Sequence, residues 1–424
     1  MTWWGRLCLA LALFISHPVA AQSNAEFEQR ATELVQILSA KSDDLDFFAP
    51  SFTAQVPPGQ ISALAARLIA QHGAVIGIGS ISQRSSNEAS VTIRYARADV
   101  RFNVVVDPLA PHRVIGLWLI SATRIGDSVE MLRTDFATLP GKSAILITSL
   151  SESATKPLLA YRADQVMAVG SSFKLWLLAE AVRQVKAGER RWSDVIPLGA
   201  PSLPSGITQD WPKGTATTFQ TLATLAISIS DNTASDTLLD ALGRRNVETM
   251  VRQIGPQSSR PLLSTIEAFA LKMRANDDLR IAFETRDAPA ARTILEANRA
   301  RLSLSAIDRT QLAGTPNHID SVEWFASPRD MAKTLNWLRT QADSEARAVL
   351  SITKGLPIGE AERFSYVGYK GGSEIGVIAM NYLVQSKSGQ YYAVTGSWND
   401  SKAAVDQAKF EALMSRAVAL VAKQ

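Results

Sequence analysis

The spacing of apolar residues in the first part of the chain predicts two helices followed by four strands. Apolar positions recur every three or four residues across 24–40, and a shorter stretch at 62–70 has the same helical spacing. Four later runs are rich in Val and Ile, alternate apolar with polar positions and are separated by turn residues; they are 74–82, 89–97, 100–106 and 113–121. Helices followed by an antiparallel meander predict a small α+β domain, in which a curved sheet packs on helices.

A second domain is expected from about residue 124, because the pattern there starts again with a helix. Its expected strands lie near both of its ends, at 143–150, 157–161, 375–384 and 391–397. Its expected helices are 127–137, a run beginning at 171, 222–228, 233–242, charged helical material within 277–301, and 403–421. The fold class that we predict for the chain is therefore α+β.

The first 21 residues have the three parts of a secretory signal peptide. Arg6 supplies the positive charge, 7–15 is the apolar stretch, and small residues at 19–21 form a cleavage site, so the mature chain is expected to begin near Gln22. The apolar stretch is too short for a comfortable membrane span, and no later stretch is long enough. We therefore expect a periplasmic or secreted protein without a stable membrane span.

Composition narrows the classes of function. The chain is 46% apolar and 20% charged, with a net charge of only +4, which argues against a nucleic-acid partner. The single cysteine, Cys8, lies in the signal peptide, so the mature chain has neither a disulfide nor a thiol nucleophile. His72, His112 and His318 are far apart and lack metal-ligand spacing. We therefore expect no metal and no cofactor.

Ser171 and Lys174 begin an apolar helix that continues through 175–179. Residues three apart share one face of a helix, so the lysine amine can reach the serine hydroxyl. A serine hydroxyl becomes a useful nucleophile when a neighbouring base takes its proton. The free N–H groups at a helix start also suit a developing oxyanion.

Two other places in the chain have the same Ser-x-x-Lys spacing, Ser153/Lys156 and Ser351/Lys354. The ordinary interpretation of any such pair is a solvated serine and a solvated lysine. Ser153 and Lys156 fall in a turn and at a strand edge, so that pair lacks the helix that the chemistry needs.

The Ser230-Asp231-Asn232 triplet has both a structural and a functional interpretation. Structurally, it ends one helix, and Asn232 caps the next helix at 233–242. Functionally, Ser230 can pass a proton to a leaving group, while Asn232 can bind a substrate amide carbonyl and the Lys174 amine. Both interpretations can hold, because a capped turn is also a rigid mount.

Lys370 precedes two glycines at the start of a β-branched run. Gly371 and Gly372 let a substrate backbone approach closely, which makes Gly372 and Ser373 candidate substrate-binding residues. The structural alternative is a lysine-guarded edge strand with a glycine bulge.

In chain order, the Ser-x-x-Lys, Ser-Asp-Asn and Lys-Gly-Gly motifs resemble those of the penicillin-recognising serine enzymes, and within them the class A β-lactamases. The Ser351/Lys354 pair follows Ser-Asp-Asn and does not fit this order. The resemblance implies that 124–424 is an antiparallel sheet flanked by helices plus an all-helical subdomain. The preceding domain, 22–123, resembles an NTF2-like α+β cone, a layout similar to that of the serine hydrolase of clavulanic acid gene clusters.

The resemblance also implies a role for each motif residue. Ser171 is the acylated nucleophile and Lys174 its general base, directly or through water. Ser230 and Lys370 form the proton path and the anion-binding wall, and the N–H groups of Ser171 and Ser373 form the oxyanion hole. A neutral Lys174 amine requires that burial beside a second cation lower its pKa from about 10.4.

Two departures from the family's pattern affect these roles. Gly371 stands where the family has Thr or Ser, and Ser373 is the residue that can replace the missing hydroxyl. The candidate deacylation base is Glu267, but Ser264 and Glu267 also form a capping-box pattern, and the family's downstream asparagine is replaced by Ala270. If Glu267 only caps a helix, deacylation must depend on Lys174 or be slow.

These residues predict a serine hydrolase that acts on a small molecule through an acyl-serine. A β-lactam amide is the expected substrate. The alternatives are an ester or D-Ala-D-Ala peptide at the same site, or a penicillin-binding sensor that is acylated without turnover.

Overall fold

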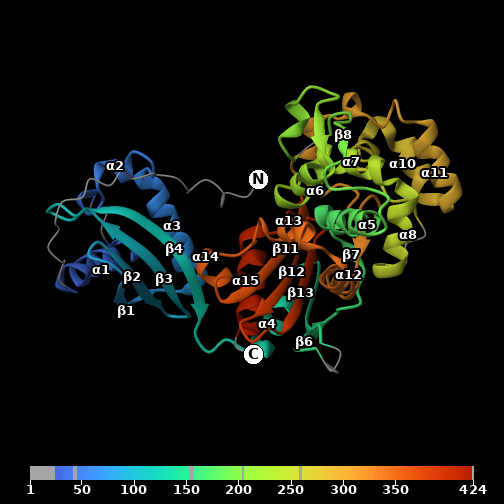
Figure 1. Cartoon of the computed structure of the whole chain (residues 1–424). Helices are drawn as coiled ribbons and strands as arrows, with labels where there is room; N and C mark the ends of the chain where they lie inside the picture. The colour runs from blue at the N-terminus through green and yellow to red at the C-terminus, as the bar shows by residue number, and fades with distance from the viewer. Residues whose placement is uncertain (1–23, 42–44, 152–156, 203–204, 257–259, 423–424) are drawn as a thin grey trace. The chain divides into compact units, whose positions relative to one another are not determined.

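The computed structural model describes residues 24–41, 45–151, 157–202, 205–256 and 260–422 (Figure 1). The chain divides into two compact units: unit 1 is Met1–Asp127 with Pro357–Glu362, and unit 2 is Ser128–Leu356 with Arg363–Gln424. The predicted signal peptide, residues 1–21, and the Ser153/Lys156 pair lie outside the described residues. Within the described ranges, no helix has both the length and the apolar character needed to cross a bilayer.

Unit 1 is an antiparallel sheet with helices packed on one face. Its strands pair in chain order, β1 (Val75–Gln83), β2 (Glu88–Tyr95), β3 (Ala98–Val106) and β4 (Val114–Arg124). Alternate residues of β3 are buried in one core with residues of α1 (Asn24–Leu38) and α3 (Pro58–His72). Two short turns, η2 (Leu45–Phe47) and α2 (Pro50–Thr53), connect the two helices. The predicted helices and strands of this region are confirmed, and the NTF2-like assignment stays a prediction.

A six-residue segment from far along the sequence also belongs to unit 1. The chain leaves unit 2 after Leu356, forms the short helix α14 (Ile358–Ala361) and returns at Arg363. Gly359 lies so close to β4 that a Cβ there would be 2.2 Å from Cγ2 of Ile120. The segment is too short to show a helical period in the sequence. Neither its helix nor its place in unit 1 was therefore predicted.

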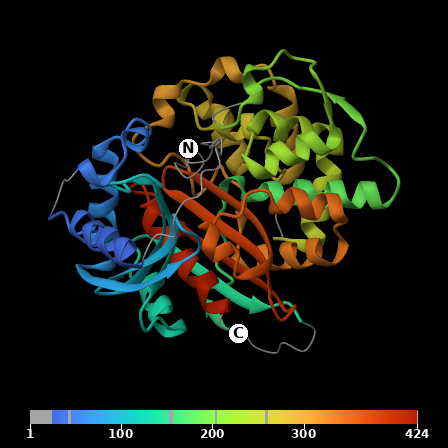
Figure 2. The same ribbon diagram turned by 60° about the vertical axis from the view of Figure 1, so that its left-hand side comes forward.

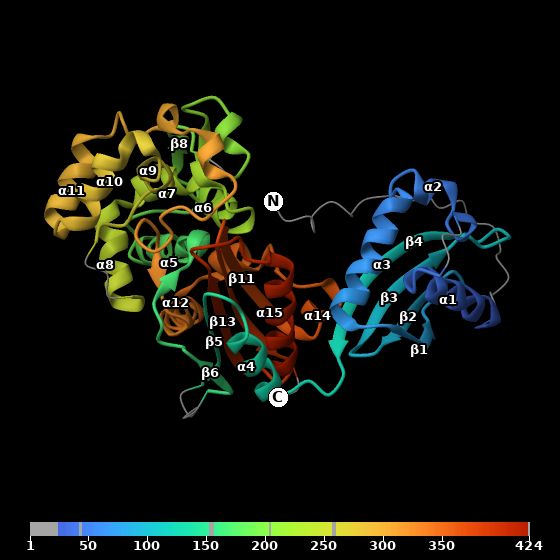
Figure 3. The same ribbon diagram turned by 180° about the vertical axis from the view of Figure 1, so that it is seen from behind.

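A five-stranded antiparallel sheet lies at the centre of unit 2. Its strand order is β11 (Phe364–Glu374), β12 (Val377–Ser386), β13 (Tyr391–Asn399), β5 (Lys142–Ser149) and β6 (Leu159–Tyr161). The helices α4 (Val129–Ala137) and α15 (Gln407–Val421) pack against each other and the sheet, with the Phe136 and Phe410 rings 5.8 Å apart (Figure 3). The helix α12 (Pro328–Gln341) also packs against β5, β12 and β13.

The other half of unit 2 is helical, and Figure 2 shows its green to orange helices gathered together. Its helices are α5 (Lys174–Lys186), α6 (Phe219–Ser228), α7 (Asn232–Leu242), α8 (Arg244–Ile254), α9 (Thr265–Leu271), α10 (Asp277–Thr285), α11 (Ala288–Ala297) and α13 (Ser344–Ser351). Two short strand pairs, β7 (Met167–Ala168) with β10 (Phe325–Ala326) and β8 (Val195–Pro197) with β9 (Ala216–Thr218), complete it. Most of α5 is buried, which follows from its nearly continuous apolar sequence.

Most of the expected elements of unit 2 are present, with two differences. The closing helix begins at Gln407 rather than at 403, because the Asp406 carboxylate accepts a hydrogen bond from the Lys409 N–H and caps the helix there. The helices α8 and α13 and the short strand pairs β7–β10 and β8–β9 were not predicted.

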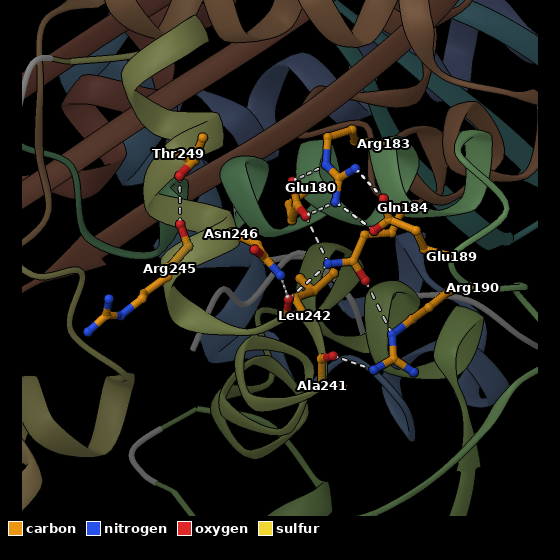
Figure 4. Close-up of polar contacts among 10 residues, drawn as sticks. All are labelled: Glu180, Arg183, Gln184, Glu189, Arg190, Ala241, Leu242, Arg245, Asn246 and Thr249. Atoms are coloured by element: carbon orange, nitrogen blue, oxygen red, sulfur yellow. Dashed lines mark hydrogen bonds and ion pairs between the residues drawn. The ribbon is translucent and has the colours of Figure 1, made fainter.

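A polar network joins the second half of α5 to the end of α7 (Figure 4). The buried Gln184 amide donates to the Leu242 carbonyl and to the Glu180 carboxylate, both at 2.8 Å. Arg183 donates to both oxygens of the Glu180 carboxylate, at 2.7 Å to Oε1, which also accepts from Gln184, and at 2.9 Å to Oε2. The Arg190 guanidinium donates to Oε1 of Gln184 at 3.2 Å. The network therefore fixes the spacing of two helices whose first residues are Lys174 and Asn232.

Candidate active site

Ser171 lies in a single 3₁₀ turn, η3 (Gly170–Phe173), that continues directly into α5. Gly170 has φ of +49°, in the left-handed region that favours glycine, and it turns the chain from β7 into the helix. The Lys174 N–H donates to the Ser171 carbonyl and closes the turn. Ser171 is half-buried and Lys174 is fully buried. Within the described part of the chain, no hydrogen bond engages the Ser171 hydroxyl.

Three contacts hold this turn in place. The Phe173 ring stacks on the Trp324 ring at 4.1 Å, and the Val169 N–H donates to the Trp324 carbonyl at 2.9 Å. The buried Asn381 amide on β12 donates to the Ser172 hydroxyl at 2.9 Å and to the Lys370 carbonyl at 3.2 Å. The turn is thereby tied to the sheet that carries Lys370.

Ser230 lies in the tight turn between α6 and α7, with φ of +59°. A non-glycine residue in this region costs about 1–3 kcal/mol and persists only where its surroundings hold it. Here the Asp231 carboxylate accepts hydrogen bonds from the N–H groups of Ala234, Ile207 and Thr208 and from the Thr208 hydroxyl, at 2.6–2.9 Å. Asp231, not Asn232, is thus the cap of α7, which corrects the predicted capping residue.

Lys174 faces this turn. Its Nζ donates to the Ser230 carbonyl at 2.7 Å, to the Ser230 hydroxyl at 3.2 Å and to Oδ1 of Asn232 at 2.7 Å. Asn232 therefore contacts the Lys174 amine, as the functional interpretation of the triplet expected.

Lys370 reaches the same hydroxyl from β11. Its Nζ, on a side chain that is almost fully buried, donates to Oγ of Ser230 at 3.0 Å. One hydroxyl oxygen is therefore held between two lysine amines that are 196 residues apart in the sequence (370 − 174).

Burial changes the charge of both amines. Burial, and then the nearby Lys370 charge, hold the pKa of Lys174 well below its ordinary value of 10.5, against weaker opposing effects of Asp236 and Asp231. Burial lowers the pKa of Lys370 from 10.5 to about 7. Lys174 is therefore suited to act as a neutral base, while Lys370 changes charge near neutral pH.

The backbone of β11 packs directly on the η3 turn. A Cβ at Gly372 would lie 2.4 Å from the Ser171 nitrogen, and a Cβ at Gly170 would lie 3.1 Å from the Ser373 nitrogen. Only glycines at these positions allow so close an approach. The backbone around Ser171 therefore lies against the backbone around Ser373, a proximity that two donors to one oxyanion would require.

The structure also explains why Gly371 departs from the family's Thr or Ser. A Cβ at residue 371 would lie only 2.3 Å from the Tyr369 hydroxyl. The Tyr369 ring lies 4.8 Å from the Tyr382 ring, tilted by 36°. The Tyr369 side chain thus takes the space of the missing residue. Ser373 is exposed at the strand end, where it can supply a hydroxyl.

Among the described residues, no hydrogen bond or ion pair joins Glu267 to Lys174, Ser230 or Lys370. One of its carboxylate oxygens accepts from the Ser264 N–H at 2.8 Å, and the other accepts from the Arg244 guanidinium at 2.7 Å. Together with the Ser264 hydroxyl it forms the capping box of α9. Of the two alternatives for Glu267, the structure has the helix cap.

Asp236 was not singled out in the sequence, although it lies one turn after Asn232 on α7. Its carboxylate accepts from the Thr265 N–H at 2.6 Å, the Thr265 hydroxyl at 2.7 Å and the Ile266 N–H at 3.0 Å. Burial raises its pKa to about 6, against the lowering effect of these hydrogen bonds. Asp236 thus fixes the start of α9 to the helix that carries Asn232; its i,i+4 spacing from Asn232 was the available clue.

The Ser351/Lys354 pair is in contact but in a different setting. The Lys354 amine donates to the Ser351 hydroxyl at 2.5 Å, and burial lowers the pKa of Lys354. Ser351 is the last residue of α13, where a helix presents carbonyl groups rather than free N–H groups. The pair therefore lacks oxyanion donors of the kind that η3 and α5 supply to Ser171.

Comparison with known proteins gives a family match that includes Ser171, Lys174 and Ser230 and ends before Lys370. The sequence model of the group described as the beta-lactamase enzyme family matches residues 129–357. No curated protein matches the chain.

Three solved structures are among those to which the chain is similar. A beta-lactamase from Sphaerobacter thermophilus is 22% identical, with a TM-score of 0.48 over 69% of this chain and 95% of that one. PBP-A is 14% identical, with a TM-score of 0.49 over 70% and 94%. An ancestral class A beta-lactamase is 20% identical, with a TM-score of 0.48 over 70% and 98%.

Proposed function

The chain belongs to the beta-lactamase enzyme family and is a serine hydrolase of that family, and on this premise we propose that it opens a β-lactam amide through an acyl-enzyme on Ser171. The observation that carries this proposal is the Ser230 hydroxyl held at 3.2 Å from the Lys174 amine and at 3.0 Å from the Lys370 amine. Two buried lysines on one hydroxyl cost folding free energy, and a proton-transfer role accounts for their presence.

In the acylation step, Lys174 acts as the base. Its neutral amine takes the proton of the Ser171 hydroxyl, and the Ser171 oxygen forms a bond to the carbonyl carbon of the substrate. The negative charge that develops on the carbonyl oxygen is stabilised by the Ser171 and Ser373 N–H groups.

The leaving nitrogen then needs a proton as the C–N bond breaks. The Ser230 hydroxyl donates that proton and regains one from the Lys174 ammonium, to which it is hydrogen-bonded. Lys370, when charged, lowers the free energy of the transient Ser230 oxyanion and attracts a substrate carboxylate.

Hydrolysis of the acyl-serine must proceed without Glu267. Both oxygens of that carboxylate are engaged in the α9 cap and the Arg244 ion pair. Lys174 is then the base that activates the hydrolytic water, and we expect deacylation to be slower than acylation.

The engaged Glu267 favours one alternative, a penicillin-binding protein or peptidase-like enzyme whose acyl-enzyme persists. An esterase using the same residues is the other alternative. We further propose that residues 1–21 direct export to the periplasm or the medium, and that unit 1 is an NTF2-like domain.

The test is the intact mass of the mature protein after exposure to a penicillin. A transient adduct with hydrolysed drug is the expected result for a lactamase, whereas a persistent adduct indicates the sensor or peptidase-like alternative. Ser171→Ala should abolish the adduct, and Ser351→Ala, the matched control, should leave it unchanged. An adduct retained in Ser171→Ala would disprove the assignment of the nucleophile.

A further inference from the structure

A second buried charged cluster lies at the end of β11, outside the machinery described above. The Lys272 amine is 2.8 Å from Oε1 of Glu323 and 2.6 Å from Oε1 of Glu374. The side chains of Lys272 and Glu323 are 2% exposed and that of Glu374 is 16% exposed. No hydrogen bond among the described residues joins this cluster to Lys174, Ser230 or Lys370.

The three charged residues come from three segments of the chain, one of which contacts the η3 turn and one of which carries Ser373. Lys272 directly follows α9, Glu323 precedes Trp324, and Glu374 directly follows Ser373 as the last residue of β11. Trp324 stacks on Phe173 and accepts the Val169 N–H, so the Glu323 segment fixes the η3 turn. The cluster thus ties the segment that holds the Ser171 N–H to the strand that holds the Ser373 N–H.

Strand alternation places Glu374 on the side of β11 that faces η3. Side chains two residues apart on a strand point to the same face. Lys370 faces Ser230, and a Cβ at Gly372 would point at the Ser171 nitrogen, so position 374 continues this face. The Glu374 carboxyl therefore lies on the same face of β11 as Lys370, and a change in its charge acts on the face that lines the candidate active site.

The charges balance in only one protonation state. Two carboxylates face one ammonium, and Lys272 and Glu323 are the charged groups that face Glu374 from the neighbouring segments. Burial, and then the Glu323 charge, raise the pKa of Glu374 to about 8 against the lowering effect of Lys272. Burial lowers the pKa of Lys272, but the two carboxylates outweigh it and the net pKa is raised. With one proton shared between the carboxyls, the cluster is neutral.

We propose that Lys272, Glu323 and Glu374 are positioning residues that hold the Ser171 and Ser373 amides together for oxyanion binding, and that they do so only while Glu374 is protonated. Loss of the proton leaves two buried carboxylates on one ammonium, which repel each other and displace the residue next to Ser373. It also adds a negative charge beside the developing oxyanion. This inference depends on the proposed acyl-enzyme function.

Glu374→Gln is the informative variant, because the amide has the shape of the protonated carboxyl and cannot ionise. The probe is a fluorescent penicillin, and the measurement is the second-order rate constant of Ser171 acylation from pH 6 to pH 9.5. At pH 6.5 we expect wild type and Glu374→Gln to agree within about twofold. At pH 9 the acylation rate constant of the wild type should be lower than that of Glu374→Gln by about fivefold or more. The ratio of the two rate constants cancels the titration of Lys370, which both proteins share.

Two further variants separate positioning from general stability. Glu374→Ala removes the Lys272 contact, and we expect at least a tenfold loss of acylation rate at pH 6.5 that Glu374→Gln does not show. Asp320→Asn is the control, because it breaks the half-exposed Lys142–Asp320 ion pair and should leave the profile unchanged. Folding of each variant is checked by thermal unfolding.

The outcomes are distinct. An unlabelled wild type would overturn the proposed function and this inference with it. A labelled wild type whose ratio to Glu374→Gln stays constant from pH 6.5 to pH 9 would overturn this inference alone. A Glu374→Ala variant that is acylated at the wild-type rate would do the same.

Discussion

At the scale of single residues, the main feature of unit 2 is two buried amines that share one hydroxyl. Lys174 and Lys370 are both nearly inaccessible to solvent, and both donate hydrogen bonds to the Ser230 hydroxyl, which is the observation from which the proton path is proposed. The free-energy cost of burying them should be measurable in the stability of the protein.

Lys370→Met is predicted to stabilise the fold at acidic and neutral pH. The pKa of Lys370 is about 7 in the folded state, against an ordinary value of 10.5. Below pH 7 the folded state therefore carries the full free-energy cost of burying the charged amine. At about 1.4 kcal/mol per pKa unit, this cost is at most about 5 kcal/mol. Between pH 7 and 10.5 the unfolded chain binds the proton more tightly, and wild-type stability rises with pH. Urea unfolding should therefore show a gain of about 2–4 kcal/mol at pH 6 that shrinks by pH 10.

The matched control is Lys333→Met, which removes an exposed lysine and should change stability by less than about 0.5 kcal/mol. If Lys370→Met were destabilised equally at pH 6 and at pH 10, that result would contradict the lowered pKa of Lys370. The same variant should also lose acylation by penicillin.

The pH dependence of acylation should differ between anionic and uncharged substrates. With either substrate, the rate rises with pH as Lys174 loses its proton, because its amine is the base. With a β-lactam that carries a carboxylate, the rate should fall above about pH 7 as Lys370 becomes neutral. An uncharged nitrophenyl ester should not show this fall near pH 7. Identical profiles for the two substrates would argue against anion binding by Lys370.

The sequence predicted the residue types of this cluster but not all of their partners. The order of Ser171, Lys174, Ser230 and Lys370 was enough to propose a common site, because each motif has characteristic neighbours. Asn381 lies within a continuous apolar strand and has no motif. Its contacts with Ser172 and Lys370 depend on the pairing of β11 with β12, which sequence spacing does not reveal.

At the scale of elements, the start of α9 is anchored by three polar side chains. Ser264 and Glu267 form its capping box, and Asp236 accepts the N–H groups of Thr265 and Ile266. The sequence predicted the capping box, since it needs only local spacing. The Arg244–Glu267 ion pair could not be predicted, because it joins α8, an unpredicted helix, to α9.

Glu267→Gln is expected to lower stability without trapping an acyl-enzyme. The amide still accepts the Ser264 N–H but loses the charge-assisted bond from Arg244, a cost of about 1–2 kcal/mol. Urea unfolding measures the first effect, and the lifetime of the penicillin adduct by intact mass measures the second.

Arg244→Met tests the same ion pair from the other side. If the pair is structural, the Arg244→Met and Glu267→Gln effects should not be additive in the double variant. A marked lengthening of the adduct lifetime in Glu267→Gln alone would restore Glu267 as a deacylation base.

At the scale of the whole molecule, the chain crosses between its two units three times. It passes from unit 1 to unit 2 after Asp127, returns for Pro357–Glu362, and re-enters unit 2 at Arg363. The helix and strand patterns predicted a first domain and a larger second one. They did not predict this return, because six residues are too few to show a period and their neighbours in unit 1 are more than 200 residues earlier.

Gly359→Val should test how firmly the returning segment is held. The new Cβ would lie 2.2 Å from the Ile120 side chain and 2.9 Å from its carbonyl oxygen, so the segment must shift, at a cost of about 1–3 kcal/mol. Calorimetry should show a lower unfolding temperature. Gly59→Ala is the control: its Cβ meets nothing within 4 Å, so it should be neutral or slightly stabilising. An unchanged transition in Gly359→Val would mean that the contact is loose.

The left-handed backbone of Ser230 limits which residues evolution or engineering can use there. Threonine keeps the hydroxyl, but β-branched residues are rarely found at positive φ. Glycine suits the backbone and removes the oxygen that both lysines contact. Asparagine and aspartate tolerate the conformation, but they offer an amide or a carboxylate in place of a hydroxyl. Serine alone among these combines the required backbone conformation with a group that can both give and receive a proton. Substitution at this position should therefore abolish the proposed proton transfer even where the fold is kept.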